Sequence, residues 1–258
     1  MATFVDLNSD MGESFGVYKM GNDADMLGIV SSANVACGFH AGDPLVMAET
    51  VANALENKVD VGAHPSLFDV WGFGRRVIRG ESPEEIEKQI VYQIGALQAI
   101  ATHGGHKVTH VKTHGALGNM AAVDAELAAA LARGVKKVDR ELIFVAIAGT
   151  ELERAGQAAG LRVAREVYAD RTYQDDGLLT PRKMPGAVLH EAEFAARRAL
   201  QMVEEQAIRS LNGVKIPVKI DTICVHGDNP AAVGMARAVR DTLQRAGVTI
   251  RPMSQFIN

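Results

Sequence analysis

The chain has 258 residues, 47% of them hydrophobic, and a formal net charge of −4 at pH 7. This length suits one (β/α) barrel or two small domains, and the mild negative charge without a Lys/Arg-rich block argues against nucleic acid as the main partner. The apolar stretches are far shorter than the roughly 20 residues of a membrane helix, and the N-terminus lacks a basic head followed by an apolar segment, so we expect neither a membrane span nor a secretory signal.

Cysteine usage is typical of a reducing compartment. Cys37 and Cys224 are the only cysteines, so one disulfide is the most that can form, and no CxxC pair is present. We therefore expect a cytoplasmic protein.

Strand-like and helix-like segments alternate along the chain. Asp43-Pro44 places an N-cap and a proline before a helical run to about Asn57, and Ser82-Pro83-Glu84-Glu85 is a capping box that begins a helix to about His103. Further helical patterns cover Asp124–Val138, Thr150–Ala159 and His190–Ser210, and Asn229-Pro230 begins a last helix that ends near Gly247. Seven strand-like runs accompany these helices, with an eighth from Val248. The alternation predicts βαβ units and a parallel sheet.

Two segments depart from this alternation. Leu211–Ile220 carries an Asn-Gly turn between short alternating runs, which predicts a surface hairpin, and Asp170–Pro185 lacks periodicity, which predicts a long loop after the sixth strand. Because no long linker or internal repeat is present, we interpret residues 1–258 as one (β/α) barrel domain. An open doubly wound sheet is the structural alternative, since the number of strands alone cannot close a barrel.

One short pattern recurs: a strand-like run ends in His or Asp, and a turn containing Gly or Pro follows. It occurs in TFVDLNSDMGE from Thr3, ANVACGFHAGDP from Ala33, VDVGAHPS from Val59, THVKTHGALGN from Thr109 and DTICVHGDNP from Asp221. In a parallel barrel the C-terminal strand ends meet at one rim, so these side chains would converge on one pocket. The pattern predicts an active site at that rim.

Side-chain alternation adds polar residues to the same strands. Positions two apart share a face, which aligns Asp6 with Asn8 and Asp10, His110 with Lys112 and His114, and Thr222 with Cys224 and His226. Three polar side chains on one strand face are costly in a dry core without hydrogen-bond partners. We therefore expect the polar set inside the barrel, in a wet pocket, and the aliphatic set against the helices.

The histidines and acids are not all equally informative. A shared strand-end position favours function for His40, His64, His114 and His226, whereas helix or loop contexts favour a hydrogen-bonded structural role for His103, His106 and His190. Asp6 lies deeper in its strand, and both roles stay open for it. Asp43 and Asn229 are well explained as helix caps.

The loop WGFGRRVIRGES, from Trp71, directly follows the His64 strand. If it folds over the pocket, an arginine fork there would suit a carboxylate or a phosphate, so we expect either Arg75 or Arg76 in the site.

Several common catalytic motifs are absent. The sequence contains no G-x-x-x-x-G-K-[ST] loop and no G-x-S-x-G elbow, which leaves general acid–base chemistry or metal-assisted hydrolysis. An Asp with two or three His suits a divalent ion, but ligands from separate strands have no diagnostic spacing, so the metal content stays open.

Six segments resemble the motifs of the LamB/YcsF lactam-utilisation family. They are DLNSDMGE, NVACGFHAGDP, GAHPSLFDVWGFGRR, VKTHGALGN, EVYADRTYQDDGLLTPR and CVHGDNP, in consistent order and spacing from the first strand to about Pro230. Motifs of this length in this order are highly specific. The fourth departs from the common VKPHGALYN at Thr113 and Gly118, which bears on loop shape more than on chemistry, and it keeps Lys112, His114, Gly115 and Asn119.

The resemblance implies a seven-stranded (β/α) barrel similar to the fold of polysaccharide deacetylases. It also implies ATP-dependent hydrolytic opening of 5-oxo-L-proline (pyroglutamate) to L-glutamate, together with 5-oxoprolinase subunits B and C. Because this chain shows no nucleotide-binding signature, we expect ATP to be bound wholly or largely by the partner subunits, and this chain to act on the lactam or its activated form.

For this reaction the strand-end residues receive candidate roles. Asp10 or His64 is the candidate base for the attacking water, His114 the candidate acid for the ring nitrogen, and Lys112 the candidate for stabilising an oxyanion or phosphate. Arg75 or Arg76 would hold the substrate carboxylate. The remaining expected substrate-binding residues are Asn8, Glu13, His40, Asp43, Asn119, His226 and Asp228.

Two other classes of function stay open. The Asp/His set and the fold relationship also fit a metal-dependent amidase or deacetylase that works alone. A non-catalytic scaffold protein, which binds the true catalytic partners, is the second alternative and predicts that pocket variants keep activity.

Overall fold

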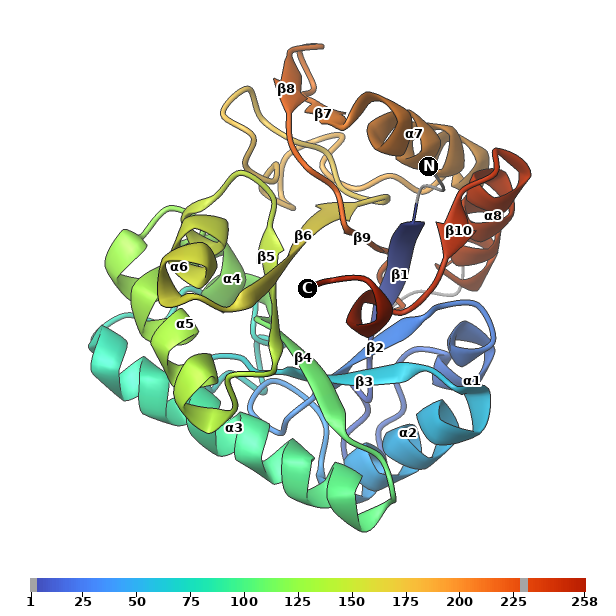
Figure 1. The fold of residues 1–258 in the computed structure, drawn as a ribbon. Coiled ribbons are helices and arrows are strands. Elements are labelled where there is room, and N and C mark those ends of the chain that lie inside the picture. Colours follow the sequence, from blue (N-terminus) through green and yellow to red (C-terminus); the bar gives the residue numbers. More distant parts are fainter. Residues whose placement is uncertain (1–3, 228–231) are drawn as a thin grey trace.

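Seven of the strand-like runs form parallel strands that close into a barrel (Figure 1). The structure is a computed structural model that describes residues 4–227 and 232–258. β9 closes the ring by pairing with both β6 and β1, so the barrel prediction is confirmed over the open-sheet alternative. In ring order the strands are β1 (Phe4–Met11), β2 (Ser32–Ala36), β3 (Asp60–His64), β4 (Val108–Lys112), β5 (Ile143–Ile147), β6 (Arg162–Tyr168) and β9 (Thr222–Cys224).

The eighth strand-like run does not add a member to the ring. β10 (Thr249–Ile250) pairs with the first two residues of β1, and β9 pairs with the residues of β1 that follow. The next short 3₁₀ helix (Met253–Gln255) lies over the centre of the ring in Figure 1. Met253 and Ile257 pack there against inward residues of β5 and β6 and form an apolar plug at the N-terminal end of the barrel.

The helices begin where the capping signals predict. The Asp43 carboxylate accepts hydrogen bonds from the backbone N–H groups of Leu45 and Val46, and Ser82 forms the predicted capping box with Glu85. The Asn229-Pro230 signal lies outside the described residues. The helices are α1 (Asp23–Leu27), α2 (Pro44–Asn57), α3 (Pro83–His103), α4 (Gly115–Ala121), α5 (Ala125–Val138), α6 (Glu151–Ala159), α7 (Ala192–Glu205) and α8 (Ala232–Arg245).

One predicted helix was too long. α7 ends at Glu205, and Gln206 takes a left-handed conformation with φ of 45°. The following residues form β7 (Ala207–Arg209), which pairs antiparallel with β8 (Lys215–Pro217), so the predicted hairpin is confirmed. β7 consists of residues that were predicted to belong to the helix. The predicted long loop after β6 is confirmed, since no helix or strand occurs between β6 and α7.

The barrel interior behind the C-terminal strand ends is polar and buried. Asn8 Nδ2 donates to Thr222 Oγ1 at 2.7 Å and to Glu166 Oε1 at 3.1 Å, and Asn34 Nδ2 donates to Asn8 Oδ1 at 2.7 Å. All four side chains are buried. The expected pocket does not extend into this layer, because its polar side chains are buried and compensate one another by hydrogen bonds.

Asp6 belongs to this buried layer, which favours the structural role. Its carboxylate accepts hydrogen bonds from the hydroxyls of Ser31, Ser32 and Thr222 at 2.7, 2.6 and 2.5 Å. Burial nevertheless raises the pKa of Asp6 from 3.8 to about 6, since the hydroxyls offset only part of the desolvation cost. The folded state thus holds this proton more tightly than the unfolded chain.

The wild-type protein is expected to lose stability as the Asp6 carboxyl ionises with rising pH, and the variant Asp6→Asn is expected not to show this loss. A raised folded-state pKa makes the carboxyl stabilising below pH 3.8, and this contribution disappears as pH rises through about 6. We expect the free energy of unfolding of the variant relative to the wild type to rise by roughly 2 kcal/mol between pH 4 and pH 7. Urea unfolding at four pH values checks this, and a difference that does not change with pH would contradict it.

Candidate active site

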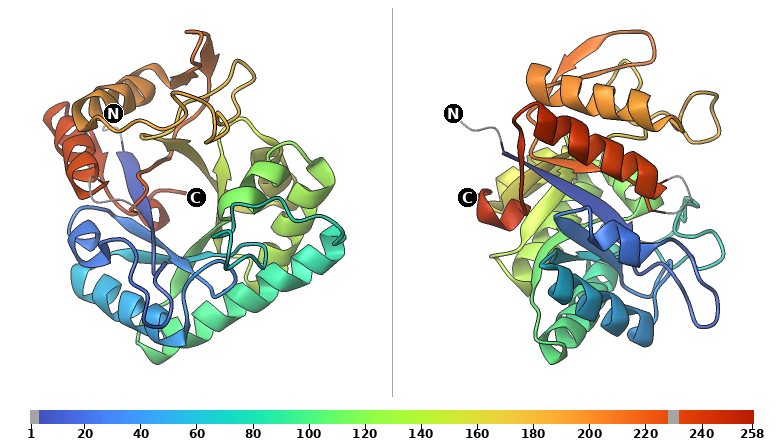
Figure 2. Two further views of the ribbon diagram at one scale, coloured as in Figure 1. Left: turned by 180° about the vertical axis from the view of Figure 1, so that it is seen from behind. Right: turned by 90° about the vertical axis from the view of Figure 1, so that its right-hand side faces the viewer.

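A cavity of about 550 Å³ lies at the C-terminal ends of the strands. The side view in Figure 2 places the termini at one end of the barrel and the loops after β1 and β3 at the other. Side chains at or just after different strands line the cavity, among them Asp10, His64, Lys112, Tyr168 and His226. The predicted convergence of strand ends is thus present in the fold.

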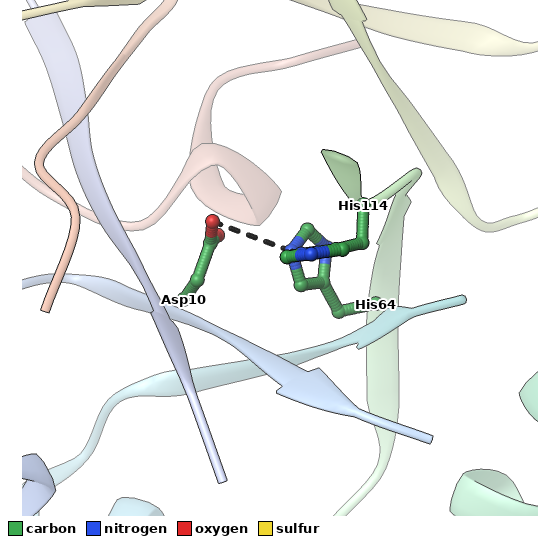
Figure 3. A group of neighbouring side chains, drawn as sticks. All are labelled: Asp10, His64 and His114. Atoms are coloured by element: carbon green, nitrogen blue, oxygen red, sulfur yellow. Dashed lines mark hydrogen bonds and ion pairs between the residues drawn. The ribbon is translucent and has the colours of Figure 1, made fainter. Parts of the chain in front are cut away.

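Asp10, His64 and His114 meet in one cluster on the cavity wall (Figure 3). His64 Nε2 lies 3.3 Å from Asp10 Oδ2 and 3.0 Å from His114 Nδ1. All three residues are at most 6% exposed. The cluster joins side chains from β1, β3 and the turn after β4.

Backbone carbonyls fix the ring tautomers of both histidines. His64 Nδ1 lies 2.7 Å from the carbonyl oxygen of Lys112, and His114 Nε2 lies 2.8 Å from that of Phe73. Because a carbonyl only accepts, each of these nitrogens carries its hydrogen. In the neutral rings His64 Nε2 and His114 Nδ1 are therefore bare lone pairs, and they face each other beside the Asp10 carboxylate.

The charge states of this cluster follow from its surroundings. Burial alone raises the pKa of Asp10, but the nearby His64 and Lys112 hold it well below its ordinary value. Burial, together with His40 and His64, lowers the pKa of His114 well below its ordinary value. At neutral pH Asp10 is thus ionised and His114 neutral.

Lys112 fixes the other side of the Asp10 carboxylate. Its Nζ is 2.8 Å from Asp10 Oδ1, 3.0 Å from Glu166 Oε1 and 3.1 Å from Cys224 Sγ. Burial lowers the pKa of Lys112, but the carboxylates of Asp10 and Glu166 raise it well above its usual range. Lys112 is therefore a protonated cation that orients Asp10.

His40 and Glu13 support His114 from behind. The His40 ring stacks on that of His114 with centroids 3.7 Å apart, and its Nε2 lies 3.0 Å from Glu13 Oε1. Burial lowers the pKa of His40 to about 3, so this ring is neutral. His40 and Glu13 contact the cluster without lining the cavity itself.

A second histidine, His226, lies near Asp10 on the cavity wall. His226 Nδ1 lies 2.7 Å from Asp170 Oδ2, and Arg182 Nη2 donates to His226 Nε2 at 3.3 Å. Since Arg can only donate, Nε2 is the acceptor and Nδ1 carries the hydrogen that Asp170 accepts. The His226 Nε2 lone pair thus points toward the cavity, 3.9 Å from Asp10 Oδ2.

The loop after β3 delivers one arginine, as expected. Arg75 lines the cavity, whereas Arg76 donates through Nε to Asp69 Oδ1 at 2.7 Å. Gly74, with φ of +63°, makes this loop possible, because an added Cβ would lie 2.6 Å from the His114 ring. Close approach of the loop backbone also places the Phe73 carbonyl on His114.

The structure separates the predicted site residues into three sets. Those that line the cavity are Asp10, His64, Arg75, Lys112, His114, Asn119 and His226. Asn8, Glu13 and His40 lie behind this wall, buried in the barrel interior or against His114. Asp43 and Arg76 do not line the cavity. The Asp43 carboxylate caps α2 and also accepts a hydrogen bond from the Gly16 N–H, and Arg76 binds Asp69. Asp228 lies outside the described residues.

Sequence reasoning missed Asp170 and the basic residues of the loop after β6. Arg171, Arg182 and Lys183 all line the cavity. The run EVYAD ends a strand in Asp, so the recurring strand-then-turn pattern should have included Asp170. Asp170 was overlooked because it was assigned to the predicted loop Asp170–Pro185 and not to the end of the strand.

The two departures from the common fourth motif adjoin each other. Thr113 and Gly118 both line the cavity, and a Cβ at position 118 would lie 3.0 Å from Thr113 Oγ1. They form part of the wall beside His114, whose backbone N–H donates to the Pro65 carbonyl at 2.9 Å.

Two global features complete the description. Within residues 4–227 and 232–258, none of the helices combines the length and apolar character needed to cross a membrane. Cys37 and Cys224 are buried free thiols.

Comparisons with known proteins match this chain along nearly its whole length. The sequence profile of the LamB/YcsF family matches residues 5–258. The A subunit of 5-oxoprolinase from Gluconobacter oxydans (strain 621H) is 54% identical over 98% of this chain and 99% of that protein. The crystal structure of a lactam utilization protein from Thermus thermophilus is 46% identical, with a TM-score of 0.90 over 96% of this chain and 99% of that one.

A distant structural neighbour bears on the fold alone. The catalytic domain of a peptidoglycan N-acetylglucosamine deacetylase from Eubacterium rectale is 11% identical, with a TM-score of 0.51 over 98% of this chain and 89% of that one. The predicted likeness of the barrel to polysaccharide deacetylases is confirmed.

Proposed function

The chain belongs to the LamB/YcsF family, and from this membership we propose that it acts as the A subunit of a 5-oxoprolinase. With its partner subunits it hydrolyses 5-oxo-L-proline to L-glutamate at the expense of ATP. The observation that carries this proposal is the 54% identity to a 5-oxoprolinase A subunit over 98% of this chain and 99% of that protein. The cavity at the strand ends is the proposed place of ring opening.

The charge of the cavity suits an anionic substrate. Arg75, Lys112, Arg171, Arg182 and Lys183 line it together with Asp10. 5-Oxoproline carries one carboxylate, and a phosphorylated lactam carries further negative charge. Guanidinium groups bind both carboxylates and phosphates through paired N–H donors. A volume of about 550 Å³ also leaves room beyond a five-membered ring.

The ATP requirement follows from the chemistry of the lactam. The amine and carboxyl of the open product are held close together, and well-oriented intramolecular reactions reach effective molarities of roughly 10⁵ M or more. Hydrolysis alone therefore has little driving force. Phosphorylation of the amide oxygen would supply both energy and a better electrophile. We assign ATP binding and this phosphorylation to subunits B and C, and ring opening to this chain.

The geometry of the cavity supports different roles for its side chains. Asp10, His64 and His114 present lone pairs that hold and orient the attacking water. The expected role of His114 as the acid is replaced, because its only ring hydrogen is bound to the Phe73 carbonyl. Lys112 keeps Asp10 ionised and in place.

We assign proton transfer to His226, with Asp170 as its positioning residue. When Arg182 turns from His226 Nε2 to the anionic substrate, this nitrogen accepts a proton from the water as the water oxygen attacks the carbon that bears the phosphorylated oxygen. The same nitrogen then delivers the proton to the ring nitrogen, which takes a second proton from the added hydroxyl as the C–N bond breaks and an acyl phosphate is left. A second water hydrolyses this acyl phosphate to glutamate and inorganic phosphate. The Asp170 carboxylate stabilises the imidazolium that exists between the two proton transfers of His226.

A reconstituted assay tests this function. ATP-dependent release of glutamate from 5-oxoproline is measured with this chain alone, with subunits B and C alone, and with all three. We expect glutamate only from the complete set. Full activity of subunits B and C alone, or of this chain alone without ATP, would contradict the proposal.

Arg75→Ala is expected to raise the KM for 5-oxoproline by roughly 10- to 100-fold, which is the range for losing a hydrogen bond to a charged group. Arg76→Lys is the matched control, because it keeps a cation beside Asp69 on the same loop. Steady-state kinetics of the reconstituted complex provide the measurement. Equal KM changes in the two variants would remove Arg75 from the proposed carboxylate site.

A further inference from the structure

When the rings of His64 and His114 are both neutral, no hydrogen lies where their nitrogens meet the Asp10 carboxylate. His64 Nε2 and His114 Nδ1 are 3.0 Å apart, and both are lone pairs in the neutral rings because the opposite nitrogens donate to backbone carbonyls. Asp10 Oδ2 adds a carboxylate oxygen 3.3 Å from His64 Nε2. Three acceptors this close repel each other unless a positive centre lies between them.

The spacing of these atoms is that of ligands around one metal ion. Zinc–nitrogen and zinc–oxygen bonds of about 2.0–2.2 Å place two ligands ~2.9 Å apart at right angles and ~3.4 Å apart in a tetrahedron. The separations of 3.0 and 3.3 Å fall in this range, and the three atoms lie within 4.8 Å of one another.

The atoms around the cluster are those expected of a metal site. A metal-binding histidine usually donates its second ring hydrogen to a carbonyl or carboxylate, which fixes its orientation. His64 and His114 both do so. The second oxygen of Asp10 is held by Lys112 Nζ at 2.8 Å, which leaves Oδ2 for the ion. The cluster also borders the cavity, so one side of an ion would remain open to water and substrate.

We propose that Asp10 Oδ2, His64 Nε2 and His114 Nδ1 bind one divalent transition-metal ion of the Zn²⁺ type. Two nitrogens and one carboxylate oxygen with an open position are a donor set suited to such ions. A bound ion would replace the direct contacts between these lone pairs and the attacking water, would hold that water at its open position and would lower the pKa of the water. The inference goes beyond the proposed function, because metal binding can be measured without any lactam or ATP.

Two overlapping groups within the described residues compete for this assignment. Glu13 and His40 could join His114, and Cys224 and His226 could join Asp10. His40 Nε2 is already paired with Glu13, however, and His226 Nε2 accepts from Arg182. Cys224 Sγ is bound by Lys112, and burial raises the pKa of this thiol well above its ordinary value. His40 Nε2, His226 Nε2 and Cys224 Sγ therefore have partners, whereas the three proposed ligand atoms face each other.

Metal titration of the full chain tests the site. Purified protein is stripped with a chelator and titrated with ZnCl₂ by calorimetry, and with Co²⁺ followed by its visible absorption. We expect one ion per chain and Co²⁺ bands typical of nitrogen and oxygen ligation. Absence of saturable binding by folded wild-type protein would overturn the proposal.

Variants then locate the ion. His64→Gln and His114→Gln are each expected to weaken Zn²⁺ binding by more than about 100-fold, since loss of an outer partner already costs 10- to 100-fold. His40→Gln and His226→Gln are expected to bind Zn²⁺ within about tenfold of the wild type. Circular dichroism verifies folding, and His64 and His114 serve as independent tests if one variant fails to fold. Binding retained by both ligand variants, or lost equally in His226→Gln, would overturn the assignment.

Discussion

His64→Gln and His114→Gln are each expected to reduce glutamate formation by roughly two to four orders of magnitude while leaving the barrel folded. The two rings present the lone pairs that orient the attacking water, and the amide of Gln offers only a weaker and differently placed acceptor. The measurement is ATP-dependent glutamate release from 5-oxoproline in the reconstituted complex, with circular dichroism to verify the fold.

His106→Gln is the control for this pair. His106 Nε2 lies 3.1 Å from the Val59 carbonyl, outside the cavity. We expect glutamate formation close to that of the wild type. Near-normal turnover in both cavity variants, or an equal loss in all three, would show that the cluster is not the reaction centre.

Lys112→Met is expected to cost about 3–5 kcal/mol of unfolding free energy, because it leaves two carboxylates buried without their cation. Lys112 Nζ lies 2.8 Å from Asp10 and 3.0 Å from Glu166 in a site that is 3% exposed. Met has nearly the same length as Lys, so the loss of unfolding free energy comes from the missing charge and not from a cavity. Urea unfolding provides the measurement, and adding Glu166→Gln should restore part of the stability.

A surface ion pair supplies the comparison. Lys137 Nζ lies 3.0 Å from Glu87 Oε1, but the Lys137 side chain is 66% exposed. Lys137→Met should therefore cost about 1 kcal/mol or less. If the two substitutions destabilise the protein equally, the Lys112 network does not have the strength that its burial implies.

Much of the fold was predictable because local signals decide it. The capping residues Asp43 and Ser82 fixed the starts of α2 and α3, and the alternation of strands and helices indicated parallel βαβ units. Local signals could not distinguish the end of α7 from β7, because that boundary depends on antiparallel pairing with β8. Closure of the ring by β9 is likewise a long-range contact that no segment encodes alone.

The location of the candidate site could be predicted from the sequence, but the roles of its residues could be predicted only in part. The strand-end pattern identified Asp10, His64 and His226, whose side chains line the cavity. It could not reveal that Asn8 is satisfied inside the barrel, since that depends on Thr222, far away in the chain. Nor could it show which ring nitrogen of His114 is free, because the Phe73 carbonyl that decides this belongs to another loop.

The central claim is that lactam opening takes place in the cavity of this chain while ATP is used by its partners. Asp10→Asn tests it most directly, because it alters the cluster without touching the partner subunits. The measurement is the amount of glutamate formed per ATP hydrolysed when the variant is combined with subunits B and C. We predict that this ratio falls at least about tenfold, in line with the loss of one group that acts on the water. If the variant complex forms as much glutamate per ATP as the wild type, and at the same rate, lactam opening does not depend on this cavity.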